Sequence, residues 1–170
     1  DLLLLSSGRI LAMIRSSGGA HLYQSYSEDG GESWSQPTPT AIPGQPGNLL
    51  QLKSGNVLCV YRVIGALGHD RGYSGRPKGY RAVLSRDEGK TWEVENEKVI
   101  CDNTLPGLVG YPSSAQLDDG TIFTLYNVLT VGEIKPEDNF QYKETLLLHP
   151  PMHSYIAGSL YTENYTMPPR

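Results

Sequence analysis

One eight-residue pattern occurs twice in this chain, and it requires a tight turn at both places. Residues 27–34 read SEDGGESW and residues 85–92 read SRDEGKTW, so both fit Ser-x-Asp-x-Gly-x-(Ser/Thr)-Trp. The Asp and Ser side chains can accept bonds from nearby backbone N–H groups, Gly takes the left-handed backbone conformation, and Trp packs beneath the loop. Each copy follows a strand-like stretch, at 21–26 and 80–84. The pattern therefore predicts two self-contained turns whose role is structural.

A second repeat accompanies the first and predicts β-hairpins. An apolar stretch, a turn that ends in Gly, and an alternating strand follow one another at 4–15, 50–62 and 115–126. Ser-Gly or Asp-Gly at the turn supplies the positive φ that tight hairpins need. The composition agrees, because 19 Gly, 12 Pro and 11 Tyr suit short strands separated by many turns. The sequence therefore predicts an all-β fold.

Charge and terminal sequence argue against two classes of partner. The formal net charge is −4, and no run of Lys or Arg is present, so nucleic acid and anionic membrane surfaces are not expected partners. The apolar start at residues 1–7 is too short to span a membrane and has no basic region before it. We expect no membrane span and no signal peptide in these residues.

The cysteines and histidines do not predict a metal site. Cys59 lies inside an apolar run and Cys101 follows another, so both are interpreted as small buried residues rather than a disulfide. The four histidines lack the spacing of metal ligands; they are His21, His69, His149 and His153.

The two turns resemble the Asp box of sialidase-type (neuraminidase) β-propellers. The resemblance implies a six-bladed β-propeller in which each box joins the third and fourth strands of a blade, away from the active site, so Asp29 and Asp87 are not expected to be catalytic. A four-stranded blade takes about 40–50 residues, so residues 1–170 are expected to form one partial propeller domain of about three to four blades. Exposed strand edges would result from a partial ring, so we expect the chain to need further blades on its N-terminal side.

Three residues resemble functional positions of the sialidase family. Arg15, after the strand that follows a Gly-Arg turn, resembles a substrate-binding arginine, and Arg81, on the strand before the second box, resembles another. A guanidinium fits a sugar carboxylate because its planar fork of donors stays charged at any working pH. Arg62 and Arg76 remain alternatives to Arg81.

The third residue is Tyr111, which opens the hairpin at 115–126 and resembles the sialidase nucleophile. Sialidases use Tyr in place of a carboxylate nucleophile. A phenol is neutral until a nearby Glu takes its proton, so the anionic sugar does not repel it. Two departures from the family pattern occur here: Pro112 stands where Ser is commoner, and Asn127 stands where Glu often follows Tyr126.

The resemblance implies a retaining exo-glycosidase that removes terminal sialic acid, or a related acidic sugar, from glycoconjugates. It implies no cofactor and a secreted or periplasmic location, and it places the activating Glu and the proton-donating Asp upstream of Asp1. One alternative is a non-catalytic Asp-box propeller that binds glycans or proteins. A hydrolase of the same superfold with a rebuilt pocket for another sugar is a third interpretation.

Overall fold

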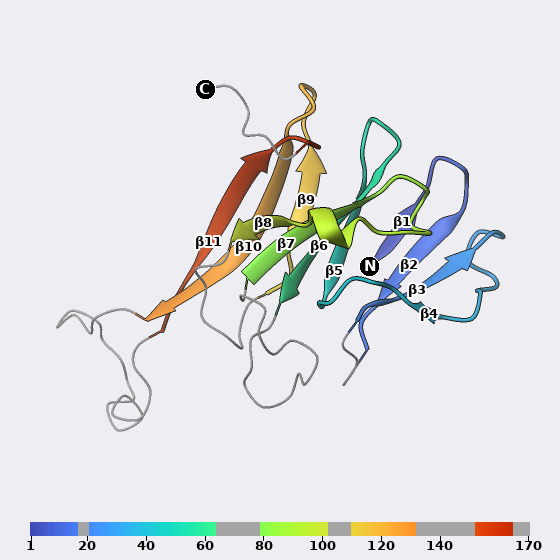
Figure 1. Ribbon diagram of the computed structural model, residues 1–170, viewed down its shortest axis with the longest axis horizontal. Coiled ribbons are helices and arrows are strands. Elements are labelled where there is room, and N and C mark those ends of the chain that lie inside the picture. Colours follow the sequence, from blue (N-terminus) through green and yellow to red (C-terminus); the bar gives the residue numbers. More distant parts are fainter. Residues whose placement is uncertain (17–20, 64–78, 102–109, 132–151, 165–170) are drawn as a thin grey trace.

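The chain folds into three antiparallel β-sheets with almost no helix, as shown by a computed structural model that describes residues 1–16, 21–63, 79–101, 110–131 and 152–164 (Figure 1). The strands of the first sheet are β1 (Leu2–Leu4), β2 (Ile10–Ile14), β3 (Tyr23–Ser27) and β4 (Thr38–Pro39). Those of the second are β5 (Gly47–Gln51), β6 (Val57–Val63), β7 (Gly79–Ser85) and β8 (Lys98–Cys101), with a 3₁₀ turn η1 (Val94–Asn96) before β8. The third contains β9 (Ser113–Gln116), β10 (Ile122–Val131) and β11 (Met152–Tyr161).

Each sheet is a meander in which consecutive strands are neighbours. The three sheets lie side by side in chain order, as successive blades of a β-propeller do (Figure 1). The prediction of an all-β, propeller-type fold is confirmed, and the three sheets agree with the expected three to four blades. The part of the chain that the structure describes contains no helix long and apolar enough to cross a membrane.

The three predicted hairpins are confirmed. They connect β1 to β2, β5 to β6 and β9 to β10. The turn of each ends in a glycine with a φ close to +90°, at Gly8, Gly55 and Gly120.

Both Asp boxes form the predicted turn, and both connect the third strand of a sheet to the fourth. In the second box the Ser85 hydroxyl donates to Asp87 Oδ1 at 2.8 Å and accepts from the Gly89 N–H at 2.7 Å. Thr91 then donates to Asp87 twice, through its N–H at 2.8 Å and its hydroxyl at 2.7 Å. Burial raises the pKa of Asp87, but these hydrogen bonds outweigh it, so the pKa lies below its ordinary value.

The first box repeats these bonds with Ser27, Asp29 and Ser33. Hydrogen bonds from the Ser33 hydroxyl and N–H, together with one from Ser27, hold the pKa of Asp29 well below its ordinary value. Both aspartates are therefore committed to their own turns, as the structural interpretation requires.

The two box tryptophans differ in their surroundings. Trp92 is 8% exposed, and its indole N–H donates to Gln24 Oε1 of the first sheet at 3.0 Å. Trp34 is 41% exposed, and its N–H donates to the Gly31 carbonyl of its own box at 3.0 Å. The second box therefore packs its tryptophan against the preceding sheet, whereas the first box keeps its tryptophan bond within itself.

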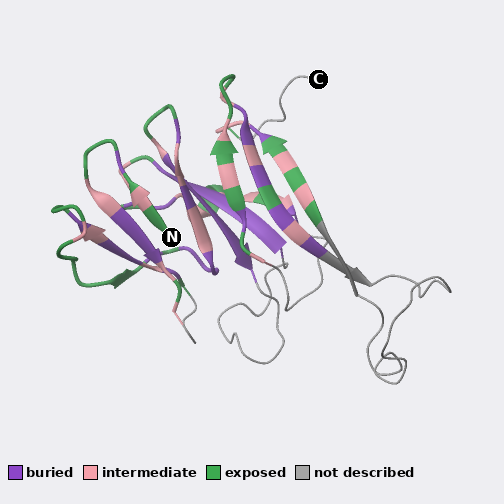
Figure 2. Ribbon diagram, turned by 180° about the vertical axis from the view of Figure 1, so that it is seen from behind, coloured by how far each residue is buried: buried purple, intermediate pink, exposed green. Residues whose placement is uncertain are grey.

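The hydrophobic core lies between neighbouring sheets. One cluster joins the first and second sheets around Leu11, Leu22 and Tyr61, and another joins the second and third around Leu58 and Ile122. Strands β6 and β7 of the middle sheet are buried at every position, and they are the purple ribbons at the centre of Figure 2. Because each strand turns alternate side chains to opposite faces, both faces of the middle sheet are covered.

Cys59 and Cys101 are both buried and form no disulfide, as predicted. They lie in different hydrophobic clusters. Burial raises the pKa of the Cys59 thiol far above its ordinary value, so this thiol stays protonated.

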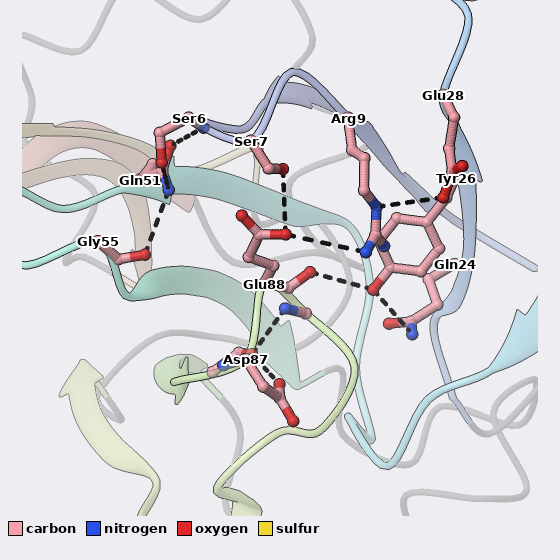
Figure 3. Close-up of polar contacts among 12 residues, drawn as sticks. Ser6, Ser7, Arg9, Gln24, Tyr26, Glu28, Gln51, Gly55, Asp87 and Glu88 are labelled. Atoms are coloured by element: carbon pink, nitrogen blue, oxygen red, sulfur yellow. Dashed lines mark hydrogen bonds and ion pairs between the residues drawn. The ribbon is translucent and has the colours of Figure 1, made fainter.

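Hydrogen bonds, an ion pair and a cation–π contact connect the second box to the first sheet (Figure 3). Glu88 accepts a hydrogen bond from the Ser7 hydroxyl at 3.1 Å and lies 3.8 Å from an Arg9 nitrogen. The Arg9 guanidinium also lies 4.2 Å from the centre of the Tyr26 ring, and the Tyr26 hydroxyl donates to the Glu88 carbonyl at 3.1 Å. Glu88 holds this position with a φ of +59°, which non-glycine residues seldom adopt.

Candidate functional site

All three sheets contribute to a cavity of about 380 Å³. Its lining comes from the start of β1, the end of β2, the start of β5 and the segment before β9. The lining residues are Asp1, Met13, Arg15, Pro46, Gly47, Asn48, Tyr111 and Pro112. Two of the three predicted site residues, Arg15 and Tyr111, therefore line the same cavity, although they adjoin strands of different sheets.

Arg15 stands directly after β2 and is exposed. Its Nε–H donates to Gln45 Oε1 at 3.0 Å, and Gln45 is only 4% exposed. Within the described residues, the terminal nitrogens of Arg15 make no hydrogen bond or ion pair. Arg15 is therefore held by one edge of its guanidinium, and the other donors remain available to a ligand.

Tyr111 lies in the segment that enters β9, and its side chain is largely exposed, at 71%. The backbone before it is fixed by Asn127, whose amide oxygen accepts from the Gly110 N–H and, at 2.8 Å, from the Tyr80 hydroxyl. Tyr80 also donates to the Asn127 carbonyl at 3.1 Å. Burial raises the pKa of Tyr80 to about 12, so this phenol stays protonated and keeps donating at any working pH.

Asn127 therefore has a structural role at the position where the sialidase family often has Glu. Its amide oxygen serves the backbone beside Tyr111, and its side chain carries no ionisable group. At this departure from the family pattern, Asn127 supports the backbone next to Tyr111.

Asp1 and Asn48 line the cavity and were not identified from the sequence. The Asp1 carboxylate accepts from the Leu49 N–H at 2.8 Å and from the Asn48 side chain at 3.1 Å, which ties β1 to β5. No motif marks either residue, because both reach the cavity through contacts between neighbouring sheets. The cavity thus contains a guanidinium, a phenol, a carboxylate and an amide.

Arg81 is not among the residues that line this cavity. It is 3% exposed on β7, and its Nη1 lies 3.4 Å from Glu97 Oε1. Glu97 also accepts a hydrogen bond from the buried Tyr61 hydroxyl. The structure therefore brings Arg15 and Tyr111 together but places Arg81 in an ion pair inside the sheet.

Arg62, an alternative to Arg81, is 8% exposed and donates through Nε to the Gln45 carbonyl at 2.9 Å. The other alternative, Arg76, lies outside the described residues, as do His69 and His149. No group of three or more metal-ligating side chains occurs in the described ranges.

Comparison with known proteins supports the fold assignment. A family model described as a BNR repeat-like domain matches residues 1–124. A crystal structure of a Dyadobacter fermentans protein of unknown function is similar over 94% of this chain, with 23% sequence identity and a TM-score of 0.65. No curated protein matches the chain.

A polysaccharide lyase, an ulvan lyase of family PL25 bound to a saccharide described as -[GlcA(1-4)Rha3S]-, is similar over 74% of the chain, with 12% identity and a TM-score of 0.52. The same values hold for a second structure of that lyase. This chain spans 36% of the Dyadobacter protein and 31% of the lyase, so it corresponds to about a third of each.

Proposed function

This chain belongs to the BNR repeat-like domain family, and from that premise we propose that it is part of a carbohydrate-active enzyme whose cavity binds and cleaves an acidic sugar. The observation that carries the proposal is that Arg15 and Tyr111 line the same cavity. A guanidinium with available donors suits a sugar carboxylate, and an exposed phenol in the same cavity suits a reaction at the ring carbon that bears this carboxylate. The saccharide bound to the ulvan lyase includes GlcA, an acidic sugar, which supports this substrate class.

The specific reaction that we propose is the hydrolytic release of terminal sialic acid or a related acidic sugar with retention of configuration. Arg15 holds the carboxylate of the sugar. The Tyr111 oxygen forms a bond to the anomeric carbon while the bond to the leaving oxygen breaks. The phenol proton passes to a carboxylate base, and the leaving oxygen takes a proton from an acid. Water then cleaves the glycosyl-tyrosine bond and restores the phenol.

Arg15 is better placed than Arg81 to bind the sugar carboxylate. Arg81 would have to leave Glu97, and separating a buried ion pair is strongly unfavourable because it leaves a buried charge uncompensated. Arg15 needs no such exchange, since its bond to Gln45 uses only Nε.

The experiment is the release of a fluorogenic aglycone from an α-sialoside by the protein, with Tyr111→Phe and Arg15→Ala variants that are shown to be folded. We expect Tyr111→Phe to lower kcat by about a thousandfold or more. We expect Arg15→Ala to lower kcat/KM roughly 100-fold because a charge-assisted bond to the sugar is lost. Matched controls are Tyr23→Phe on β3 and Arg86→Ala, whose partner Glu93 lies outside the cavity lining. Equal activity in the site variants and their controls would refute the assignment.

A second candidate function is the binding of acidic glycans without cleavage. It is favoured by Pro112 and Asn127, because both depart from the family pattern around Tyr111. Calorimetric titration with N-acetylneuraminate and with its methyl ester separates the two functions. Carboxylate-dependent binding without turnover of any acidic glycoside would favour the binding protein.

A further inference from the structure

Gln45 is a polar residue buried at the junction of the first two sheets. It lies between β4 and β5 and is 4% exposed. A buried amide is costly unless its polar atoms find hydrogen-bond partners. Its partners therefore show what the position is used for.

Those partners are two arginines from different sheets. The Gln45 side-chain oxygen accepts from Arg15 Nε at 3.0 Å, and its backbone carbonyl accepts from Arg62 Nε at 2.9 Å. The Gln45 N–H in turn donates to the Arg62 carbonyl at 3.0 Å. The backbone of Gln45 is thus hydrogen-bonded to Arg62 of β6, and its side chain is hydrogen-bonded to Arg15.

Because Arg15 bonds Gln45 through Nε, its two terminal nitrogens can face a ligand. A guanidinium is planar, so a bond to Nε fixes its plane while leaving both terminal nitrogens free to face a ligand. An arginine side chain otherwise has many rotamers, and ordering it on binding would reduce the affinity for the ligand. Arg15 is exposed and would not be held by packing alone.

We propose that Gln45 is a positioning residue that holds the Arg15 guanidinium toward the cavity before the ligand arrives. The expected consequence, tighter binding of an acidic sugar, rests on the proposed function. Its structural part, the fixing of Arg15 by the Gln45 amide, can be measured without any sugar.

The test compares Gln45→Leu, which removes the acceptor with little change in volume, with Gln45→Glu, which keeps an acceptor for Arg15 Nε. Gln51→Leu is the matched control, because Gln51 also links the first two sheets, accepting from the Ser6 N–H at 2.8 Å, yet lies outside the cavity lining. The first readout is the Nε–H signal of Arg15 in ¹⁵N NMR spectra of the protein without ligand. The second is KM and kcat on the fluorogenic α-sialoside.

We expect a protected Arg15 Nε–H signal in the wild-type protein, in Gln45→Glu and in Gln51→Leu, and at least tenfold faster proton exchange in Gln45→Leu. We expect Gln45→Leu to raise KM about tenfold, the usual effect of losing a hydrogen bond to a charged group, with little change in kcat. A purely structural role would instead reduce the amount of active protein and leave KM unchanged.

An unprotected Arg15 Nε–H in the wild-type protein would overturn the inference, even if Gln45→Leu did not fold. So would an unchanged signal in Gln45→Leu. If the signal behaves as expected but the wild-type protein neither binds nor cleaves an acidic sugar, the positioning of Arg15 stands and the proposed function fails.

Discussion

Replacing Gly89 with alanine tests how rigidly the first two sheets are joined. Gly89 has a φ of +87°, and a Cβ at this position would lie 2.7 Å from Leu11 Cδ2 and 3.0 Å from the Tyr26 hydroxyl. Gly31 is the matched position in the first box, with a φ of +100°, but its Cβ would meet nothing closer than 3.9 Å. The two substitutions therefore share a backbone penalty, and only the substitution of Gly89 adds a collision with the neighbouring sheet.

The shared penalty is about 1–2 kcal/mol, the usual cost of a left-handed conformation for a residue with a Cβ. The collision adds about 1–3 kcal/mol for overpacking. Leu11 is fully buried and Tyr26 is already bonded to Glu88, so neither can move aside freely. We expect Gly89→Ala to lower the free energy of unfolding by about 2–5 kcal/mol and Gly31→Ala by about 1–2 kcal/mol.

Urea denaturation followed by circular dichroism measures both losses. The prediction concerns the difference between the two variants, because the backbone penalty cancels in it. Equal losses of unfolding free energy in the two variants would mean that the sheets move apart easily enough to accept a methyl group. The conclusion that the second box packs closely on the first sheet would then be refuted.

Three further predictions concern the boxes and the support of the cavity. Trp92→Phe leaves a buried amide oxygen without its donor and should cost about 1–3 kcal/mol, whereas Trp34→Phe should cost under about 0.5 kcal/mol; thermal melts compare them. Because the pKa of Asp87 is lowered in the folded chain, its contribution to stability is present above the ordinary value of 3.8 and is lost as pH falls below it. The urea midpoint of Asp87→Asn should therefore fall less steeply below pH 4 than that of the wild-type protein, and an identical acid limb would refute this. Asn127→Leu removes the acceptor for the Gly110 N–H, so that amide should exchange with solvent at least about tenfold faster; unchanged exchange would show that this bond does not hold the segment.

The turns could be predicted from the sequence because everything that forms them is local. Ser85, Asp87 and Thr91 satisfy one another within a single eight-residue pattern, and the same is true of the first box. Short motifs also made Arg15 and Tyr111 candidate site residues, although only the fold shows that they line the same cavity.

Contacts between sheets could not be predicted in this way. Glu88 occupies the place that Gly30 fills in the first box, and it keeps a left-handed backbone while its carboxylate reaches Ser7. Nothing in the second box itself reveals that partner. Arg81 shows the same limit, because its ion pair with Glu97 depends on how β7 and the segment before β8 come together in space.

The Asp box makes some hydrogen bonds within itself and others to a neighbouring sheet, and this division suggests how the repeat can be duplicated. The Ser and Asp bonds travel with any duplicated copy, since they need no residue outside it. A residue that faces a neighbour, such as Glu88, can then differ between copies without disrupting the turn, as the comparison with Gly30 shows. A gene encoding such a chain can therefore lengthen by copying whole blades, because each copy brings a turn whose hydrogen bonds are already satisfied.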